Sequence, residues 1–144
     1  MDKGYMRGRN IIEHNERVRD NVELRGRMGG GVVRILSRVV SEVFGVSEGD
    51  ILRVRRGRRV VSDARMCFMW HLREDAAMGW SEIGRYCGHS HASVIHAVRE
   101  YDEITALGVD KGLIGRFERV SLALRFDVNY ANAVGRYKEA CKIF

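Results

Sequence analysis

An arginine-rich run near the middle of the chain is the clearest candidate for chemistry. It reads Arg53-Val54-Arg55-Arg56-Gly57-Arg58-Arg59, five arginines in seven residues with no acidic residue among them. Guanidinium groups form paired hydrogen bonds with phosphate oxygens and base edges, and neighbouring like charges repel one another unless an anion lies close. The chain has a net charge of +6, and the excess lies in its first two-thirds. The run, which we expect to be an exposed loop, therefore favours contact with nucleic acid.

A short cluster of small and polar residues further along could contact bases. Ser90 is typical of a helix N-cap, and the helix that it begins should extend to about Ala106. The face of this helix opposite its apolar residues carries His91 at the rim, Ala92, Ser93, His96 and Arg99. Short side chains at the N-terminal end let a helix backbone sit deep in the major groove of DNA. The positive end of the helix dipole also favours a nearby phosphate.

The residues just before this cluster complete a helix-turn-helix pattern. Ser81 is expected to cap a short helix that ends at Cys87, and Gly88 closes it. Gly84 lies on its inner face, where the missing side chain permits close approach of the partner helix. Two short helices joined by a tight turn with glycine are the helix-turn-helix arrangement. Residues 81–104 are therefore predicted to bind double-stranded DNA.

The rest of the chain must position these two features. Apolar residues recur at helical spacing and there is no proline, which indicates an all-α protein. Further helices are expected over 32–44, over 63–76 with Ser62 as N-cap, over 112–125, and from an Asp127 cap to the C-terminus. Gly29-Gly30-Gly31 predicts a flexible break. We therefore expect three parts: a polar arm or helix with a glycine-rich linker over 1–31, a DNA-binding domain over 32–106, and a C-terminal helical extension over 107–144.

The stretch from about Val39 to Glu103 resembles the C-terminal DNA-binding domain of the bacterial replication initiator DnaA. The matching pieces are Phe44-Gly45-Val46-Ser47, the arginine-rich run, Ala64-Arg65 at the opening of the next helix, and Ser81-Glu82-Ile83-Gly84. The segment from Gly88 to Ala97 stands where the family signature reads Gly-Gly-Arg-Asp-His-Thr-Thr-Val-Leu-His-Ala. The resemblance implies a multi-helix, Trp-repressor-like helix-turn-helix domain, here with extra C-terminal helices.

The resemblance also implies roles for individual residues. In that family the basic loop sends an arginine into the minor groove, and the matching residue is Arg56, with Arg55 as the near alternative. Arg58 and Arg65 match positions that contact the DNA backbone. The residues that match the base- and phosphate-contacting part of the signature are Ser90, His91, Ala92, Ser93 and His96.

Three departures from the signature limit what carries over. The turn is one residue shorter, because Gly88-His89 replaces Gly-Gly-Arg. Ser90 replaces the signature Asp, which removes a carboxylate that could accept from cytosine, and Ala92 replaces the first Thr. DNA binding therefore carries over, but the initiator's own recognition sequence does not. The chain also lacks a Gly-x-x-x-x-Gly-Lys-[Ser/Thr] phosphate loop, so the sequence makes no case for a nucleotide cofactor.

Metal binding and catalysis are the alternative interpretations of the same residues. Cys87, His89 and His91 could ligate zinc, with Cys67 or His71 as a fourth ligand. Their spacing runs from one helix across a turn into another, unlike the paired knuckles of structural zinc sites, and Cys87 falls on an apolar face. We therefore expect no metal. Ser90 and Ser93 near His91 and His96 could suggest a nucleophile and base, but serine at a helix start is ordinary capping and no acidic orienter is evident. We expect no enzyme activity.

Partners and compartment follow from the remaining features. No apolar run approaches the roughly 20 residues that cross a bilayer, and the N-terminus lacks a secretory pattern. We expect a cytoplasmic, nucleoid-associated protein with no membrane partner, and so small a chain would suit a phage or mobile-element regulator. An apolar stripe from Tyr130 to Phe144 should pack on the domain. In the alternative, this stripe forms a homodimer or docks on a replication or transcription protein, and the chain is a protein-interaction module.

Overall fold

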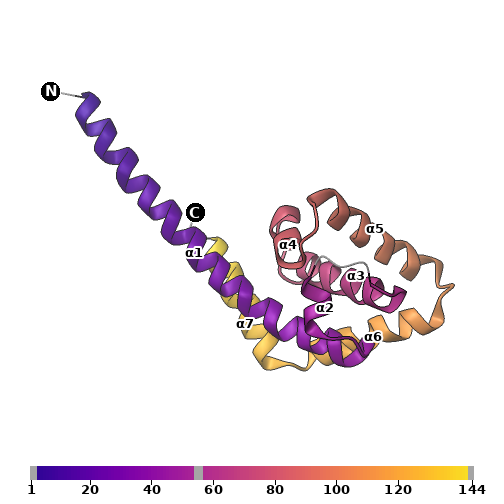
Figure 1. Ribbon diagram of the computed structural model, residues 1–144. Helices are drawn as coiled ribbons and strands as arrows, with labels where there is room; N and C mark the ends of the chain where they lie inside the picture. The colour runs from indigo at the N-terminus through magenta and orange to yellow at the C-terminus, as the bar shows by residue number, and fades with distance from the viewer. Residues whose placement is uncertain (1–2, 54–56, 143–144) are drawn as a thin grey trace.

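The protein is a bundle of helices set on one long helix (Figure 1). The computed structural model describes the backbone of residues 3–53 and 57–142 and the side chains of residues 22–53 and 57–142. Across the described residues there are seven helices and no strand, so the all-α prediction is confirmed. Their bounds are α1 Lys3–Phe44, α2 Glu48–Leu52, α3 Arg59–Glu74, α4 Trp80–Cys87, α5 His91–Leu107, α6 Lys111–Arg125 and α7 Val128–Cys141.

Helix α1 runs through Gly29, Gly30 and Gly31 without interruption, so the expected flexible break is wrong. Tertiary packing outweighs the low helix propensity of glycine here. A Cβ placed on Gly29 would lie 2.7 Å from the hydroxyl of Tyr86 in α4 and 3.4 Å from the ring of Tyr137 in α7. The missing side chain lets both aromatic residues approach the α1 backbone, and their packing holds the helix together at this point. The domain boundary placed at residue 31 stays a prediction.

An aromatic stack fastens the C-terminal helices to the centre of the molecule. Trp70 of α3 stacks on Tyr101 of α5 at a centroid distance of 4.2 Å, and Tyr101 stacks on Phe117 of α6 at 4.1 Å. Trp70 Nε1 also donates a hydrogen bond to Asp102 Oδ1 over 2.9 Å. Such large rings account for much of the apolar area that a small core can bury. Helix α6 is therefore an integral part of the bundle.

Helix α7 packs antiparallel along α1 (Figure 1). Its inward residues Tyr130, Ala133, Tyr137 and Ala140 are buried, which accounts for the apolar stripe up to Cys141; Phe144 lies outside the described residues. The described part of the stripe therefore packs on the protein's own helix, as expected, and the protein-interaction alternative stays a prediction. No described helix is both long enough and apolar enough to cross a membrane.

The helix starts were predicted with mixed success. Ser90 and Asp127 act as N-caps as expected, and Ser47 caps α2 in the same way; each side chain accepts a hydrogen bond from a backbone N–H in the first turn. Ser62 does not, because α3 begins three residues earlier at Arg59 and places Ser62 inside the helix. Helix α4 begins at Trp80, so Ser81 is likewise inside its helix. In both cases the backbone extends the helix past the serine toward the preceding glycine-containing loop.

Candidate nucleic-acid interface

Helices α4 and α5 form the predicted helix-turn-helix around a very tight turn. Gly88 ends α4 in the left-handed conformation with φ of 67°, which glycine adopts without strain. The N–H of His89 then donates to the carbonyl of Gly84 over 2.9 Å. A Cβ on Gly84 would collide with the carbonyl oxygen of His89. The missing side chain of Gly84 thus permits close approach of the turn backbone. The sequence had suggested close approach of the partner helix instead.

The N-terminal end of α5 presents the expected polar face. Ser90 Oγ accepts a hydrogen bond from the N–H of Ser93 over 3.2 Å and lies 3.0 Å from the hydroxyl of Ser93. The inward residues Val94, Val98 and Tyr101 are buried. The remaining side chains of the predicted contact face are all exposed: His91, Ala92, Ser93, His96 and Arg99. The geometry therefore leaves the outward face of the first two turns of α5 open to a ligand.

The arginine-rich run divides between described and undescribed residues. Arg55 and Arg56, on which the resemblance placed the minor-groove contact, lie outside the described residues. On either side of them Arg53, Arg58 and Arg59 are exposed. Arg58 is the N-cap residue of α3, so the guanidinium groups of Arg58 and Arg59 are carried by the start of a well-packed helix.

Arg65 has a different place from the one that its sequence position suggested. It lies in the second turn of α3 rather than at its opening, and it is only 6% exposed. Its Nε donates to the carbonyl of Asp50 over 2.9 Å and its Nη2 to the carbonyl of Arg53 over 2.6 Å. A buried guanidinium that donates to two backbone carbonyls fixes the chain to which those carbonyls belong. Arg65 therefore anchors Arg53, the first residue of the arginine-rich run. A contact between Arg65 and phosphate stays a prediction.

The sequence contained a signal for this role. Arg65 follows Ala64 and lies three and seven residues before Phe68 and Leu72, which are both buried. An arginine on the inward face of an amphipathic helix needs buried acceptors for its N–H groups. Helical periodicity therefore indicated burial, although it could not name the acceptors.

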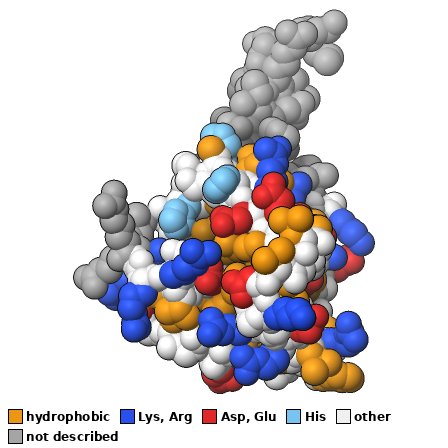
Figure 2. All heavy atoms as spheres, turned by 90° about the vertical axis from the view of Figure 1, so that its right-hand side faces the viewer, with side chains coloured by type: hydrophobic (Ala, Val, Ile, Leu, Met, Phe, Trp, Pro, Cys, Tyr) orange, Lys and Arg blue, Asp and Glu red, His pale blue; other side chains and the backbone are white. Residues whose placement is uncertain are grey.

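A hollow of about 500 Å³ joins the start of α3 to the predicted contact face of α5, which we call its recognition face. Arg59, Ser62 and Arg65 line it from α3, and Ser93 and His96 line it from α5. Acidic groups are present as well, namely Asp63 and Glu100. Burial raises the pKa of Asp63 above its usual value, against the opposing effect of Arg59. Figure 2 shows histidine side chains grouped on this side of the molecule, with Lys or Arg and acidic side chains beside them.

His89, in the turn, also lines this hollow. Burial, followed by the nearby charge of Arg65, lowers the pKa of its imidazole. Its Nε2 is buried and has no hydrogen-bond partner among the described residues.

The residues considered for zinc do not gather into a site. Cys87 is buried, and its thiol donates to the carbonyl of Ile83 over 3.3 Å. Burial raises the pKa of the Cys87 thiol to about 11 and raises that of Cys67 further. Both thiols are therefore protonated residues of the apolar core. No group of three His, Cys, Asp or Glu side chains suitable for a metal occurs within the part of the chain that the structure describes.

A buried polar network that the sequence did not reveal joins α3, α6 and α7. His71 Nδ1 lies 2.8 Å from Asp75 Oδ2, and its Nε2 lies 3.4 Å from the hydroxyl of Ser121. Tyr130 donates to the same Asp75 oxygen over 2.8 Å. Although burial alone would raise it, the pKa of Asp75 is lowered by its hydrogen bond and attraction to His71 and by the Tyr130 hydroxyl.

The order Ser121, His71 and Asp75 resembles a catalytic triad, but the surroundings differ. Ser121 lies inside α6, where neighbouring backbone N–H groups are used by the helix and cannot form an oxyanion hole. The network is therefore a structural link between helices.

Comparison with known proteins bears on the helix-turn-helix directly. The family model described as the bacterial dnaA protein helix-turn-helix matches residues 33–100. This range begins inside α1 and ends inside α5, so it contains the arginine-rich run, the tight turn and the recognition face. Over residues 33–100 the chain is therefore similar to the bacterial DnaA helix-turn-helix, and the resemblance inferred from the sequence is confirmed.

Curated relatives agree with this DnaA assignment. The chromosomal replication initiator protein DnaA of Caulobacter vibrioides is 30% identical over 107 residues, which cover 71% of this chain and 21% of the relative. DnaA of Caulobacter sp. strain K31 is 31% identical over 88 residues, which cover 58% of this chain and 18% of the relative. The chain thus spans about a fifth of the length of the curated relatives that it matches. No solved structure shows significant similarity to it.

Proposed function

We propose that this protein binds double-stranded DNA by two elements at once. The N-terminal face of α5 reads base edges in the major groove, and the arginine-rich run contacts the backbone and the adjacent minor groove. The observation that carries the proposal is the shared hollow, which places Arg59 at the end of the run beside Ser93 and His96 of α5. Two short elements this close can touch neighbouring parts of one duplex.

The exposed side chains of α5 suit this task. Imidazole and hydroxyl groups exchange hydrogen bonds with base edges, and the methyl group of Ala92 can contact the methyl group of thymine. Exposed arginines such as Arg58 and Arg59 contact phosphates and dominate the affinity, which should fall steeply with salt. From the family resemblance we assign Arg56, with Arg55 as the near alternative, to the minor groove. We propose a role as a replication or transcription regulator, and the similarity to replication initiators supports the replication context.

The test separates base reading from phosphate binding. Sequences bound from a pool of random duplexes identify a preferred site, and fluorescence anisotropy then measures the affinity for that site and for an unrelated duplex. The double variant His91→Ala/Ser93→Ala should lose about tenfold or more for the preferred site and much less for the unrelated duplex. Glu103→Ala, on an exposed turn further along α5, is the matched control. Equal losses for both duplexes would show that α5 does not read bases.

A further inference from the structure

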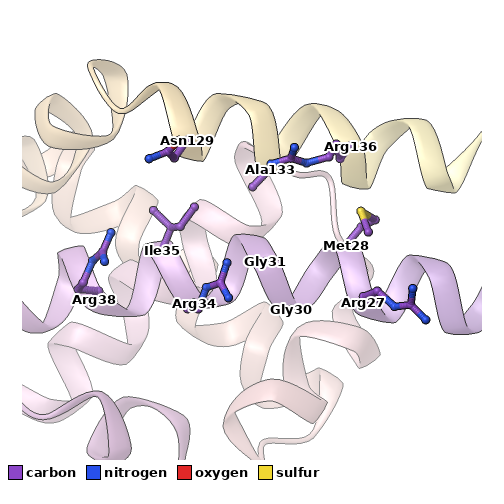
Figure 3. A pocket seen from close by; sticks show the side chains of 10 residues that line it. All are labelled: Arg27, Met28, Gly30, Gly31, Arg34, Ile35, Arg38, Asn129, Ala133 and Arg136. Atoms are coloured by element: carbon purple, nitrogen blue, oxygen red, sulfur yellow. The ribbon is translucent and has the colours of Figure 1, made fainter.

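A second basic surface lies in a groove between α1 and α7, outside the helix-turn-helix. The groove measures about 640 Å³ and is lined by Arg27, Arg34 and Arg38 of α1 and by Arg136 of α7. Figure 3 shows the three arginines of α1 along one helix and Arg136 across the groove on the other. All four are exposed, and no described acidic residue lines the groove. Within residues 22–53 and 57–142 none of the four guanidinium groups forms a salt bridge.

The arrangement of these arginines fits an extended polyanion. Arg27 and Arg38 are eleven residues apart on α1, which is about 16 Å along a helix axis. A small anion cannot reach both ends of such a row. A DNA duplex carries roughly ten phosphate charges over the same length. Arginine also binds phosphate oxygens with paired hydrogen bonds, which lysine cannot do.

Two glycines leave the floor of the groove without side chains and make α1 less stable than alanines would. Gly30 and Gly31 line it, and a Cβ on either one would meet nothing within 4 Å. Packing inside the chain therefore explains Gly29 but not its two neighbours. Glycine in a helix interior is less stable than alanine by about 0.5–1 kcal/mol per residue. Bare backbone at this place lets a bulky ligand approach α1 between the arginines.

The arginines of the groove lie on a different side of α1 from its contact with α4. Gly29 marks the side of α1 that meets Tyr86 of α4. At about 100° per residue, Arg27, Arg34 and Arg38 lie roughly 140–180° around the helix from Gly29. No residue that lines this groove also lines the hollow beside α5.

We propose that the groove between α1 and α7 binds the phosphate backbone of a second DNA duplex, so that one chain holds two duplex segments. That this duplex is a second one rests on the proposed function, in which α5 holds the first; the groove's own contacts do not involve α5. The contacts are to phosphates, so the second duplex needs no particular sequence.

The test uses the full chain and a triple variant, Arg34→Ala/Arg38→Ala/Arg136→Ala. The control Lys111→Ala/Arg119→Ala/Arg125→Ala removes the same charge from exposed residues of α6. Both are measured by anisotropy on an unrelated duplex over a range of salt. The groove variant should bind about tenfold more weakly at low salt. The slope of log K against log salt should fall by about 2–3, since each phosphate that the protein no longer neutralises lowers it by about 0.9. The control should change the slope by less than about 1.

Bridging is measured directly with a preferred-site duplex on beads. Beads saturated with protein should recruit a labelled, unrelated duplex, and the groove variant should recruit none while its affinity for the preferred site is kept. Recruitment that survives in the groove variant, as in a dimer bridging through two copies of α5, would overturn the proposal. So would capture of polyglutamate or of phosphatidylglycerol vesicles by the groove without any effect on duplex binding. Failure of base reading appears separately, in the His91→Ala/Ser93→Ala measurement.

Discussion

The helix-turn-helix and the α1–α7 pair carry basic surfaces of different kinds. The surface at α5 mixes Arg59, His96 and Ser93 with acidic Asp63 and Glu100. The α1–α7 groove has four arginines and no described acidic lining residue. Acidic groups inside a DNA-binding face weaken binding to phosphate alone and leave more of the affinity to base contacts. The difference fits the two proposals: the mixed surface at α5 suits discrimination between base sequences, whereas the arginine-lined groove suits the phosphates of a duplex of any sequence.

The two regions also differ in how they are held. The turn between α4 and α5 is fixed by contacts within a few residues, through Gly84, Gly88 and the Ser90 cap. The α1–α7 pair depends on contacts between distant parts of the chain. Tyr86 donates to the carbonyl of Gly26 over 3.2 Å, and Tyr137 donates to Glu82 of α4 over 2.6 Å. Substitutions at contacts within the turn should therefore act on the helix-turn-helix, whereas substitutions at contacts that join α4 to α1 or α7 should act on both regions.

The largest effect is expected from Gly84→Ala. The added Cβ meets the backbone carbonyl of His89, which cannot move without opening the turn. We expect a loss of about 3 kcal/mol in the free energy of unfolding, measured by urea denaturation, and a loss of duplex binding. Gly112→Ala is the control, because a Cβ there has its nearest contact at an ordinary 3.8 Å. A stable Gly84→Ala protein with normal DNA affinity would contradict the close packing of the turn.

Arg65→Met should destabilise the protein less and reveal how the arginine-rich run is held. The substitution leaves the carbonyls of Asp50 and Arg53 without these donors, at an expected cost of about 2 kcal/mol. DNA affinity should fall because Arg53 and the run that follows are no longer positioned. If Arg65 acts by positioning, the salt slope should stay nearly constant; a direct phosphate contact would reduce it by about 1. Anisotropy over a salt series separates the two roles.

The sequence predicted the features that depend on local contacts and did not predict those that depend on distant contacts. The Ser90 cap, the Gly88 turn and the outward face of α5 were predicted because each depends on residues a few positions apart. The continuity of α1 was not, because three successive glycines favour a break until Tyr86 and Tyr137 pack against Gly29. The anchoring role of Arg65 and the network around His71 depend on acceptors 12 to 55 residues away, which periodicity cannot identify.

Acid should weaken the link between α3 and α7 before it affects the turn. The folded-state pKa of Asp75 is lowered, so its ionised form adds stability above the unfolded value of about 3.8, and that stability is lost as the pH falls through the lower folded-state pKa. Asp75→Asn should therefore remove part of the dependence of the unfolding free energy on pH below about 4. Denaturation of both proteins at several acidic pH values measures this. Identical pH profiles would mean that the carboxylate does not stabilise the fold.

The smallest expected effect, from Gly30→Ala, bears most directly on the comparison of the two surfaces. A Cβ at Gly30 meets nothing within 4 Å, so the variant should be more stable by about 0.5–1 kcal/mol in denaturant unfolding. The same methyl group stands on the floor of the arginine groove and should weaken binding of an unrelated duplex by a few fold while affinity for the preferred site is unchanged. Gly26→Ala is the matched control, since it is also unobstructed on α1 but does not line the groove. If both variants gain stability and neither changes duplex binding, Gly30 has no part in ligand approach. If only Gly30→Ala weakens non-selective binding, a gain in folding stability is accompanied by a loss of function at the groove, and stability alone cannot explain the glycine there.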